Sequence, residues 1–178
     1  MPLKLNKEAI TKEPDSNSTL NSQRTREKAE QLFPQESWYE IEKGIFLAQS
    51  RKPKNKNQEQ ILEKEIEQAR ILVQYGSTVY FLPEEPHVNN EKHPDAIVDG
   101  EITEFKTIEG GIRKVEARFK EARMKADRVF LKIDSSLTKE NVIRKLKEVI
   151  VSKSYCNGQI IVYFTENKHL YFWDVKDL

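Results

Sequence analysis

The dipeptide Asp99-Gly100 constrains the fold of this chain more than any other feature. It lies within PDAIVDGEITEFKT (residues 94–107), between two short runs that alternate apolar and polar residues. Asp-Gly in this setting is the strongest short-range signal for a two-residue β-hairpin. In the register set by such a turn, Asp95 lies opposite Glu104. The sequence therefore predicts two carboxylates that face each other across a hairpin.

Two facing carboxylates need a cation. Residues directly opposite in an antiparallel pair have Cβ atoms about 5 Å apart, and like charges there are destabilising. Side chains alternate along a strand, so Lys106 lies on the face of Glu104 and can neutralise one of the two acids. Oxygen ligands from two carboxylates, with positions left for water and phosphate, suit Mg²⁺ or Mn²⁺ better than zinc.

These residues predict metal-assisted hydrolysis of a nucleic acid. A bound metal would polarise the scissile phosphodiester and activate a water, while Lys106 would position that water or neutralise charge in the transition state. Spacing leaves open an exposed hairpin of mixed charge, in which Lys106 only bridges Glu104. Against this alternative, Ile97 and Ile102 fall on the face of the acids, so we expect this face to be covered by other parts of the protein. The charges on it would then be partly buried, and buried charges are costly unless they are paired or bind a metal.

The rest of the chain predicts an α/β fold, a three-layer sandwich with a mixed central sheet. Apolar residues recur at helical spacing from Gln58 to Tyr75, and Gly76 stands where a C-terminal cap belongs. A hairpin or a strand with a turn is expected at 38–50. The elements expected after it are a helix (58–75), a strand (77–82), the Asp-Gly hairpin, a helix (112–127), a strand (129–134), a helix (136–152) and two strands (159–164 and 169–175).

The length of 178 residues is that of one domain. Residues 1–35 show no sustained periodicity and predict a flexible N-terminal arm, with a short helix around Thr25 to Phe33. Residues 36–178 form the predicted nuclease domain, whose core begins at about residue 58.

Composition excludes several classes of protein. No stretch approaches the roughly 20 apolar residues of a membrane span, and the N-terminus lacks the apolar region of a secretory signal. A single cysteine excludes an intrachain disulfide framework and a multi-cysteine zinc site. The net charge of +1 argues against a polybasic coat. We therefore expect a cytoplasmic site of action without a membrane partner.

Pro94-Asp95, followed after eight residues by Glu104-Phe105-Lys106, resembles the signature of the PD-(D/E)XK nuclease superfamily. The order of helices and strands also resembles the core of that superfamily, which is like that of restriction endonucleases. This resemblance implies that Asp95 and Glu104 bind the metal and that Lys106 is the catalytic lysine.

A longer run of sequence is more specific. EIEQARILVQYGSTVYFLPE, then HPDAIVDGEITEFKTIEGG, then a basic helix ending in KADRVFLKID, is similar to the tRNA-nuclease toxin domain at the C-terminus of CdiA contact-dependent growth-inhibition proteins. That domain is also found attached to phage head-morphogenesis proteins. The similarity extends from about Phe46 to the C-terminus and implies a cognate immunity protein as partner.

The family's first-helix glutamate, a further metal ligand, corresponds best to Glu65. Periodicity agrees, because Leu62, Glu65 and Ala69 lie along one helical stripe and a carboxylate in an apolar stripe is unusual. An error of one turn in the helix phase would favour Glu63 or Glu67 instead.

The second helix of this superfamily packs beside the site, and here it is basic. Lys114, Arg118 and Lys125 are the expected phosphate contacts, with Lys114 and Arg118 one turn apart and Lys125 two turns beyond Arg118 on a shared face. A solvated helical face with i,i+4 ion pairs is the alternative for each of them.

Two further residues are candidate accessory groups. Thr107 follows the lysine as in the family and would hydrogen-bond near the site, although an ordinary strand threonine is the alternative. His93 is cross-strand from Lys106 in the predicted register and would act as general base in a metal-free ribonuclease, with a polar loop residue as the alternative.

The leading hypothesis is thus a metal-dependent endonuclease that cuts RNA, with tRNA favoured by the resemblance alone. A DNA endonuclease is the second hypothesis, because the same residues would cut DNA. A catalytically silent nucleic-acid or assembly module is the third.

Overall fold

The computed structural model describes residues 17–84 and 93–178. Its elements are α1 (Asn17–Leu32), β1 (Trp38–Glu42), β2 (Ile45–Ala48), α2 (Lys56–Gln74), β3 (Val79–Phe81), β4 (Ala96–Val98), β5 (Glu101–Ile108), α3 (Ile112–Arg123), β6 (Arg128–Ile133), α4 (Lys139–Lys153), β7 (Gln159–Phe164) and β8 (His169–Asp174), with 3₁₀ turns at Gln49–Arg51 and Val175–Asp177. None of these helices is both long enough and apolar enough to cross a lipid bilayer.

One eight-stranded sheet runs through the molecule in the order of the sequence, from β1 to β8. The pairs β2/β3, β5/β6 and β6/β7 are parallel, and the other four pairs are antiparallel. Each parallel pair is joined through a helix, as a crossover requires. The predicted α/β fold with a mixed sheet is confirmed.

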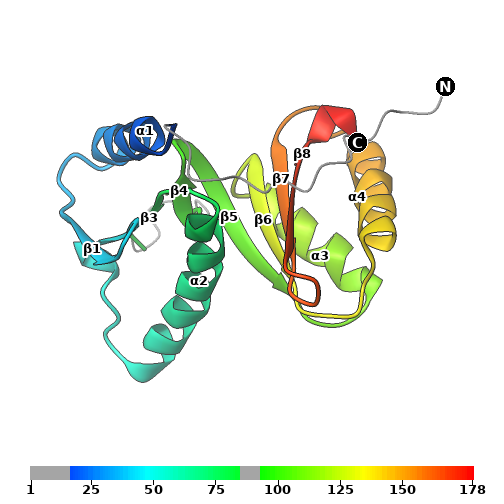
Figure 1. The fold of residues 1–178 in the computed structure, drawn as a ribbon, viewed down its shortest axis with the longest axis horizontal. Coiled ribbons are helices and arrows are strands. Elements are labelled where there is room, and N and C mark those ends of the chain that lie inside the picture. Colours follow the sequence, from blue (N-terminus) through cyan, green and yellow to red (C-terminus); the bar gives the residue numbers. More distant parts are fainter. Residues whose placement is uncertain (1–16, 85–92) are drawn as a thin grey trace.

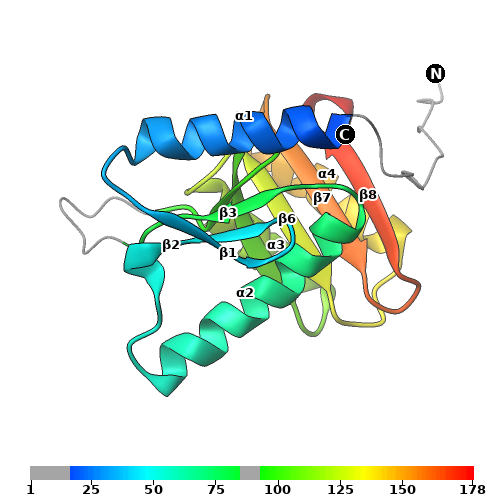
Figure 2. The same cartoon turned by 60° about the vertical axis from the view of Figure 1, so that its left-hand side comes forward.

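Helices cover both faces of this sheet and make the three predicted layers (Figures 1 and 2). Helix α2 packs on one face, where Leu72, Phe81 and Phe105 are buried in one cluster. Helices α3 and α4 pack on the opposite face over β5 to β8, and α1 packs on that same face over β3 and β4. Alternation along β5 therefore separates its side chains into an α2 face and an α1/α3 face.

The hairpin forms in the predicted register. Ala96 pairs with Thr103, Ile97 with Ile102, and Val98 with Glu101. Asp99 and Gly100 have φ angles of 51° and 84°, which is the left-handed region that a two-residue turn of this twist requires at both positions. The backbone N–H of Thr78 also donates to Asp99 Oδ1 at 2.9 Å, so the turn is tied to the strand beside it.

Helix α2 is capped at both ends by local hydrogen bonds. Asn55 precedes its first turn and accepts a hydrogen bond from the backbone N–H of Gln58 at 3.0 Å. At the other end Gly76 has a φ of +89°, and the N–H groups of Gly76 and Ser77 donate to the carbonyls of Val73 and Leu72. The predicted glycine cap is confirmed, and it fixes the direction of the helix that carries Glu65.

Two helices differ from their predicted bounds. Helix α1 runs from Asn17 to Leu32, where only a short helix within a flexible arm was expected, and Ala29 lies fully buried in the core. Helix α3 ends at Arg123, four residues before the predicted end, because the chain turns there into β6. Lys125 is therefore outside the helix.

Candidate active site

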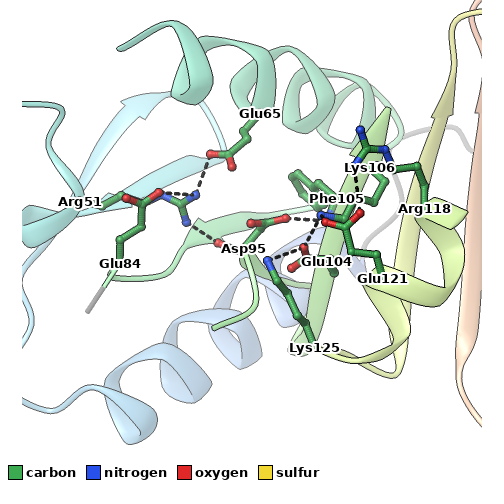
Figure 3. A network of polar contacts seen from close by, with 10 residues as sticks. All are labelled: Arg51, Glu65, Glu84, Asp95, Glu104, Phe105, Lys106, Arg118, Glu121 and Lys125. Atoms are coloured by element: carbon green, nitrogen blue, oxygen red, sulfur yellow. Dashed lines mark hydrogen bonds and ion pairs between the residues drawn. The ribbon is translucent and has the colours of Figure 1, made fainter. Parts of the chain in front are cut away.

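Glu104 on β5 is the most buried charged side chain of the site, with 0% of it exposed. Its Oε1 lies 2.9 Å from the Lys106 ammonium and 2.8 Å from the Lys125 ammonium. Both lysines thus hold the same carboxylate oxygen (Figure 3). A buried carboxylate without such partners would be strongly destabilising. The two ammonium groups therefore explain how the core can accommodate the charge of Glu104.

Lys106 is held from a second side. Its ammonium donates to Glu121 Oε1 on α3 at 3.2 Å, and Glu121 in turn pairs with Arg118 at 2.9 Å. Burial lowers the pKa of Lys106, but its hydrogen bonds to Glu104 and Glu121 outweigh burial and raise that pKa. Lys106 is therefore a cation that two carboxylates hold from two sides.

Asp95 lies just before β4, one residue beyond the last pair of the hairpin ladder. Its Oδ2 accepts a hydrogen bond from the backbone N–H of Phe105 at 2.8 Å. Burial, together with the charge of Asp95, raises the pKa of Glu104 on β5, and it does the same for Glu65 on α2. Asp95 thus stands between two other carboxylates and repels both.

Glu65 completes the group from the other face of the sheet. Only 16% of its side chain is exposed, and its Oε2 accepts a hydrogen bond from Arg51 at 2.7 Å. Burial raises the pKa of Glu65 to about 7 against the opposing charge of Arg51. Of the alternatives weighed for this role, Glu63 is 54% exposed and pairs with Arg70, and Glu67 is exposed. Glu65 is the only one of the three that lies toward Asp95.

The basic residues expected to bind phosphate lie apart. Lys114 is exposed on α3, and Arg118 is exposed but already paired with Glu121. Lys125 does not share their face, because α3 ends before it and its ammonium turns inward to the buried Glu104. This corrects the expectation of a common face for Arg118 and Lys125.

One of the two accessory candidates, Thr107, does not join the acids. Thr107 accepts a hydrogen bond from Gln68 of α2 at 2.9 Å, which places it on the face of β5 opposite Lys106. His93 is half-buried and precedes the ladder, whose last pair is Ala96 with Thr103. The ladder does not extend to His93, and an approach of its side chain to Lys106 stays a prediction.

Arg51 is a site residue that the sequence did not reveal. It is buried, and its Nη1 donates to the backbone oxygens of Leu82 and Asp95 at 2.9 and 2.7 Å while Nη2 donates to Glu65. In sequence it belongs to the run RKPKNKN, which has the composition of a basic surface loop. Its partners lie 14 to 44 residues away, and no local pattern announces them.

Glu121 and Gln68 were also missed. Glu121 stands three residues after Arg118, a helical spacing that favours an ion pair, but nothing in the sequence links it to Lys106. Gln68 is a buried polar residue in the apolar face of α2. A polar residue within an apolar helical stripe can be recognised in a sequence, and this pattern would have singled out Gln68.

The donors fit a hard divalent cation in kind, because all are carboxylate oxygens. Glu65 comes from α2, Asp95 from just before β4 and Glu104 from β5, and Glu104 Oε2 is buried without a hydrogen bond from any described residue. As the side chains stand, no three His, Cys, Asp or Glu residues within 17–84 and 93–178 converge closely enough to hold a metal ion. Arg51 and the two lysines take these oxygens instead.

The comparison with known proteins bears on this segment. Residues 92–169 match the model of the contact-dependent growth inhibition CdiA C-terminal domain family. No curated protein sequence matches the chain. Among solved structures, the CdiA-CT/CdiI toxin and immunity complex from Burkholderia pseudomallei is similar, with a TM-score of 0.48 and 19% sequence identity over 72% of this chain and 98% of that one. The stretch that carries Asp95, Glu104 and Lys106 is thus the stretch that resembles the CdiA C-terminal domain.

Proposed function

We propose that this protein is a metal-dependent endonuclease that hydrolyses phosphodiester bonds in RNA, with tRNA as its substrate, and that it acts as a toxin of the PD-(D/E)XK type. The observation that carries this proposal is the position of Asp95, whose charge acts on both Glu65 and Glu104, beside a lysine fixed against Glu104. The match of residues 92–169 to the CdiA C-terminal domain supports the toxin assignment.

Glu65, Asp95 and Glu104 would hold the cation, Mg²⁺ or Mn²⁺. When bound, it supplies a Lewis acid for the phosphate and lowers the pKa of a water molecule. Its charge would also relieve the mutual repulsion of the three acids.

Lys106 would contribute its fixed positive charge. Glu104 and Glu121 hold the ammonium from two sides, at 2.9 and 3.2 Å, so little reorganisation is needed when negative charge develops on the phosphate. Lys125, on the same oxygen of Glu104, would be released toward the substrate if a cation took its place. Lys114 and Arg118 would bind backbone phosphate farther along α3.

A partner is part of the proposal. A toxin that cuts nucleic acid in the cytoplasm needs a neutralising immunity protein in the cell that makes it. The basic surface of α3 around Lys114 and Arg118, both exposed, is the surface that an acidic partner of this kind would cover.

A DNA endonuclease with the same residues is the second candidate. A silent binding module is favoured by one observation, namely that Lys106 and Lys125 already neutralise Glu104. Such an ion-paired acid needs no metal to be stable.

A cleavage assay separates these candidates. Wild type, Lys106→Ala and the control Lys139→Ala, on α4, are incubated with total tRNA and with plasmid DNA in Mg²⁺, Mn²⁺ or EDTA. We expect tRNA fragments that are lost with EDTA and with Lys106→Ala but retained with Lys139→Ala. Cleavage of DNA alone would support the second candidate, and no metal-dependent cleavage of either substrate would contradict the enzyme.

A further inference from the structure

A cavity of about 610 Å³ lies beside Lys125, between α1, the end of α3 and the starts of β5, β6 and β7. Lys28 of α1 lies on one wall, and the other walls are formed by the turn from α3 into β6 and by the start of β7. Lys125, which holds Glu104 at 2.8 Å, is part of its lining. Lys125 therefore links the cavity to the buried carboxylate of Glu104, and the size of the cavity falls in the usual range for small-ligand sites.

Two cations in this cavity make no direct ion pair. Neither Lys28 nor Arg128 makes an ion pair with any residue in the described part of the chain, and both line the cavity. Arg128 is nevertheless fixed, because its Nη1 donates to the backbone oxygen of Val98 at 2.8 Å and its Nε donates to Gln159 Oε1 at 2.8 Å. A guanidinium has five N–H groups, so donors remain for a ligand.

The lining of the cavity also contains two acids, and its net charge is still positive. Asp127 is paired with Arg123 at 3.3 Å, and Glu101 is exposed at the hairpin turn. Burial lowers the pKa of Arg128 and outweighs the charges of Glu101, Asp99 and Asp174, which raise that pKa. An anion placed between Lys28 and Arg128 would relieve that cost.

The cavity also has an apolar side. Ile102 of β5 is half-buried, and Met124, after the end of α3, is 59% exposed. Both line the cavity. An apolar surface beside two cations matches a nucleotide, which carries a flat base and a phosphate together.

We propose that this cavity binds one unpaired nucleotide of the substrate strand, next to the phosphate that is cut. Arg128 and Lys28 bind its phosphate, and its base lies against Ile102 and Met124. This proposal rests on the proposed function, because it takes RNA as the substrate that the enzyme cuts. It adds a selection for single-stranded or looped RNA, since a base must leave its pair and its stack to enter a cavity.

The test measures binding without cleavage. In a Lys106→Ala background with EDTA, the affinity for a fluorescein-labelled 12-nucleotide single-stranded RNA is measured by anisotropy over a series of salt concentrations. The variants are Lys28→Glu and Arg128→Gln, and the matched controls on α4 are Lys147→Glu and Arg144→Gln. A blunt RNA duplex of the same length serves as the second ligand.

We expect each cavity variant to bind at least about fivefold more weakly and to lower the slope of log K against log salt by about 0.7, the value for one lost single-strand phosphate contact. The controls should stay within about twofold of the parent, and the duplex should bind more weakly than the single strand. Arg128→Gln also removes bonds to Val98 and Gln159, so Lys28→Glu on α1 carries the test if the arginine variant is poorly folded.

Unchanged affinity and slope in Lys28→Glu, or equal binding of duplex and single strand, would overturn the proposal. The cleavage assay on wild type keeps this failure apart from that of the nuclease. If wild type cleaves RNA and the cavity variants bind it as well as the parent does, only the nucleotide site is contradicted. Cavity-dependent RNA binding without any cleavage removes the hydrolase and keeps the binding site.

Discussion

The ammonium of Lys125 lies 2.8 Å from Oε1 of the fully buried Glu104. The two residues come from different elements, a strand and the turn that follows a helix, and they meet only because α3 ends at Arg123. A lysine from outside the motif thus helps to neutralise the central acid. The acids of this site are held together by cations of the chain itself, and a divalent metal would compete for the same oxygens.

Replacing Asp95 by asparagine should preserve the fold and abolish activity. Asn can still accept the hydrogen bond from Phe105, while the charge that repels Glu65 and Glu104 is removed. We expect a melting temperature that is equal to that of wild type or up to about 4 °C higher, corresponding to about 1 kcal/mol. Cleavage should fall by about 100-fold or more.

Differential scanning fluorimetry and the tRNA assay check this prediction, with Asp177→Asn, an exposed residue near the C-terminus, as the control. A strongly destabilised Asp95→Asn protein that still cleaves would show that Asp95 is structural.

Glu65 should make stability depend on pH. Its pKa is raised from 4.5 to about 7 by burial, so the folded state favours the protonated form. The stabilising effect of that proton is complete below pH 4.5 and is lost as the pH rises through 7. Gln at this position stays neutral throughout. The free energy of unfolding of Glu65→Gln relative to wild type should therefore increase by roughly 3 kcal/mol between pH 4.5 and pH 8.

Urea unfolding of EDTA-treated protein at both pH values measures this difference. Glu63→Gln, on the same helix but 54% exposed, is the matched control. A difference between Glu65→Gln and wild type that is the same at pH 4.5 and pH 8 would refute the raised pKa.

Replacing Arg51 by lysine should destabilise the protein. The guanidinium bridges Leu82, Asp95 and Glu65, and a lysine has neither the planar fork nor enough reach to keep all three bonds. We expect a loss of about 2 to 4 kcal/mol in the free energy of unfolding. Arg70→Lys weakens the exposed pairs with Glu42 and Glu63 and should cost about 1 kcal/mol or less. Equal effects of the two changes would argue against a structural role for Arg51.

Thr107 should contribute to stability and not to chemistry. Thr107→Val leaves the buried amide of Gln68 without its partner, at a cost of about 1 to 3 kcal/mol. The double variant Gln68→Leu/Thr107→Val should recover much of that loss, and a double-mutant cycle of unfolding free energies measures the coupling. Because Thr107 faces α2 and not Lys106, the cleavage rate should change by less than about tenfold. A larger loss of rate in a stable variant would return Thr107 to the active site.

Much of the fold follows from local signals. The hairpin was predictable because both turn residues need a positive φ, and Asp-Gly supplies it. The extent of α2 was predictable from its apolar spacing and from Gly76. Helix α1 was underestimated because it has few apolar residues, and the side chains that it buries fully, Thr25 and Ala29, are small.

The site was only half predictable. Asp95, Glu104 and Lys106 belong to one hairpin, so a turn and the alternation of side chains bring them close. Arg51 and Lys125 reach the same acids across distant elements, and a sequence carries no local trace of such contacts. The end of α3 decided the position of Lys125, and the boundaries of helices are the least reliable part of a sequence-based prediction.

Metal binding tests the central claim most directly, since the account depends on a cation shared by Glu65, Asp95 and Glu104. Isothermal titration of Mn²⁺ into EDTA-stripped wild type and Asp95→Asn compares the two proteins. The account predicts saturable Mn²⁺ binding to wild type and an affinity at least about tenfold lower in Asp95→Asn. Equal affinity in both proteins, or no uptake by wild type, would contradict it.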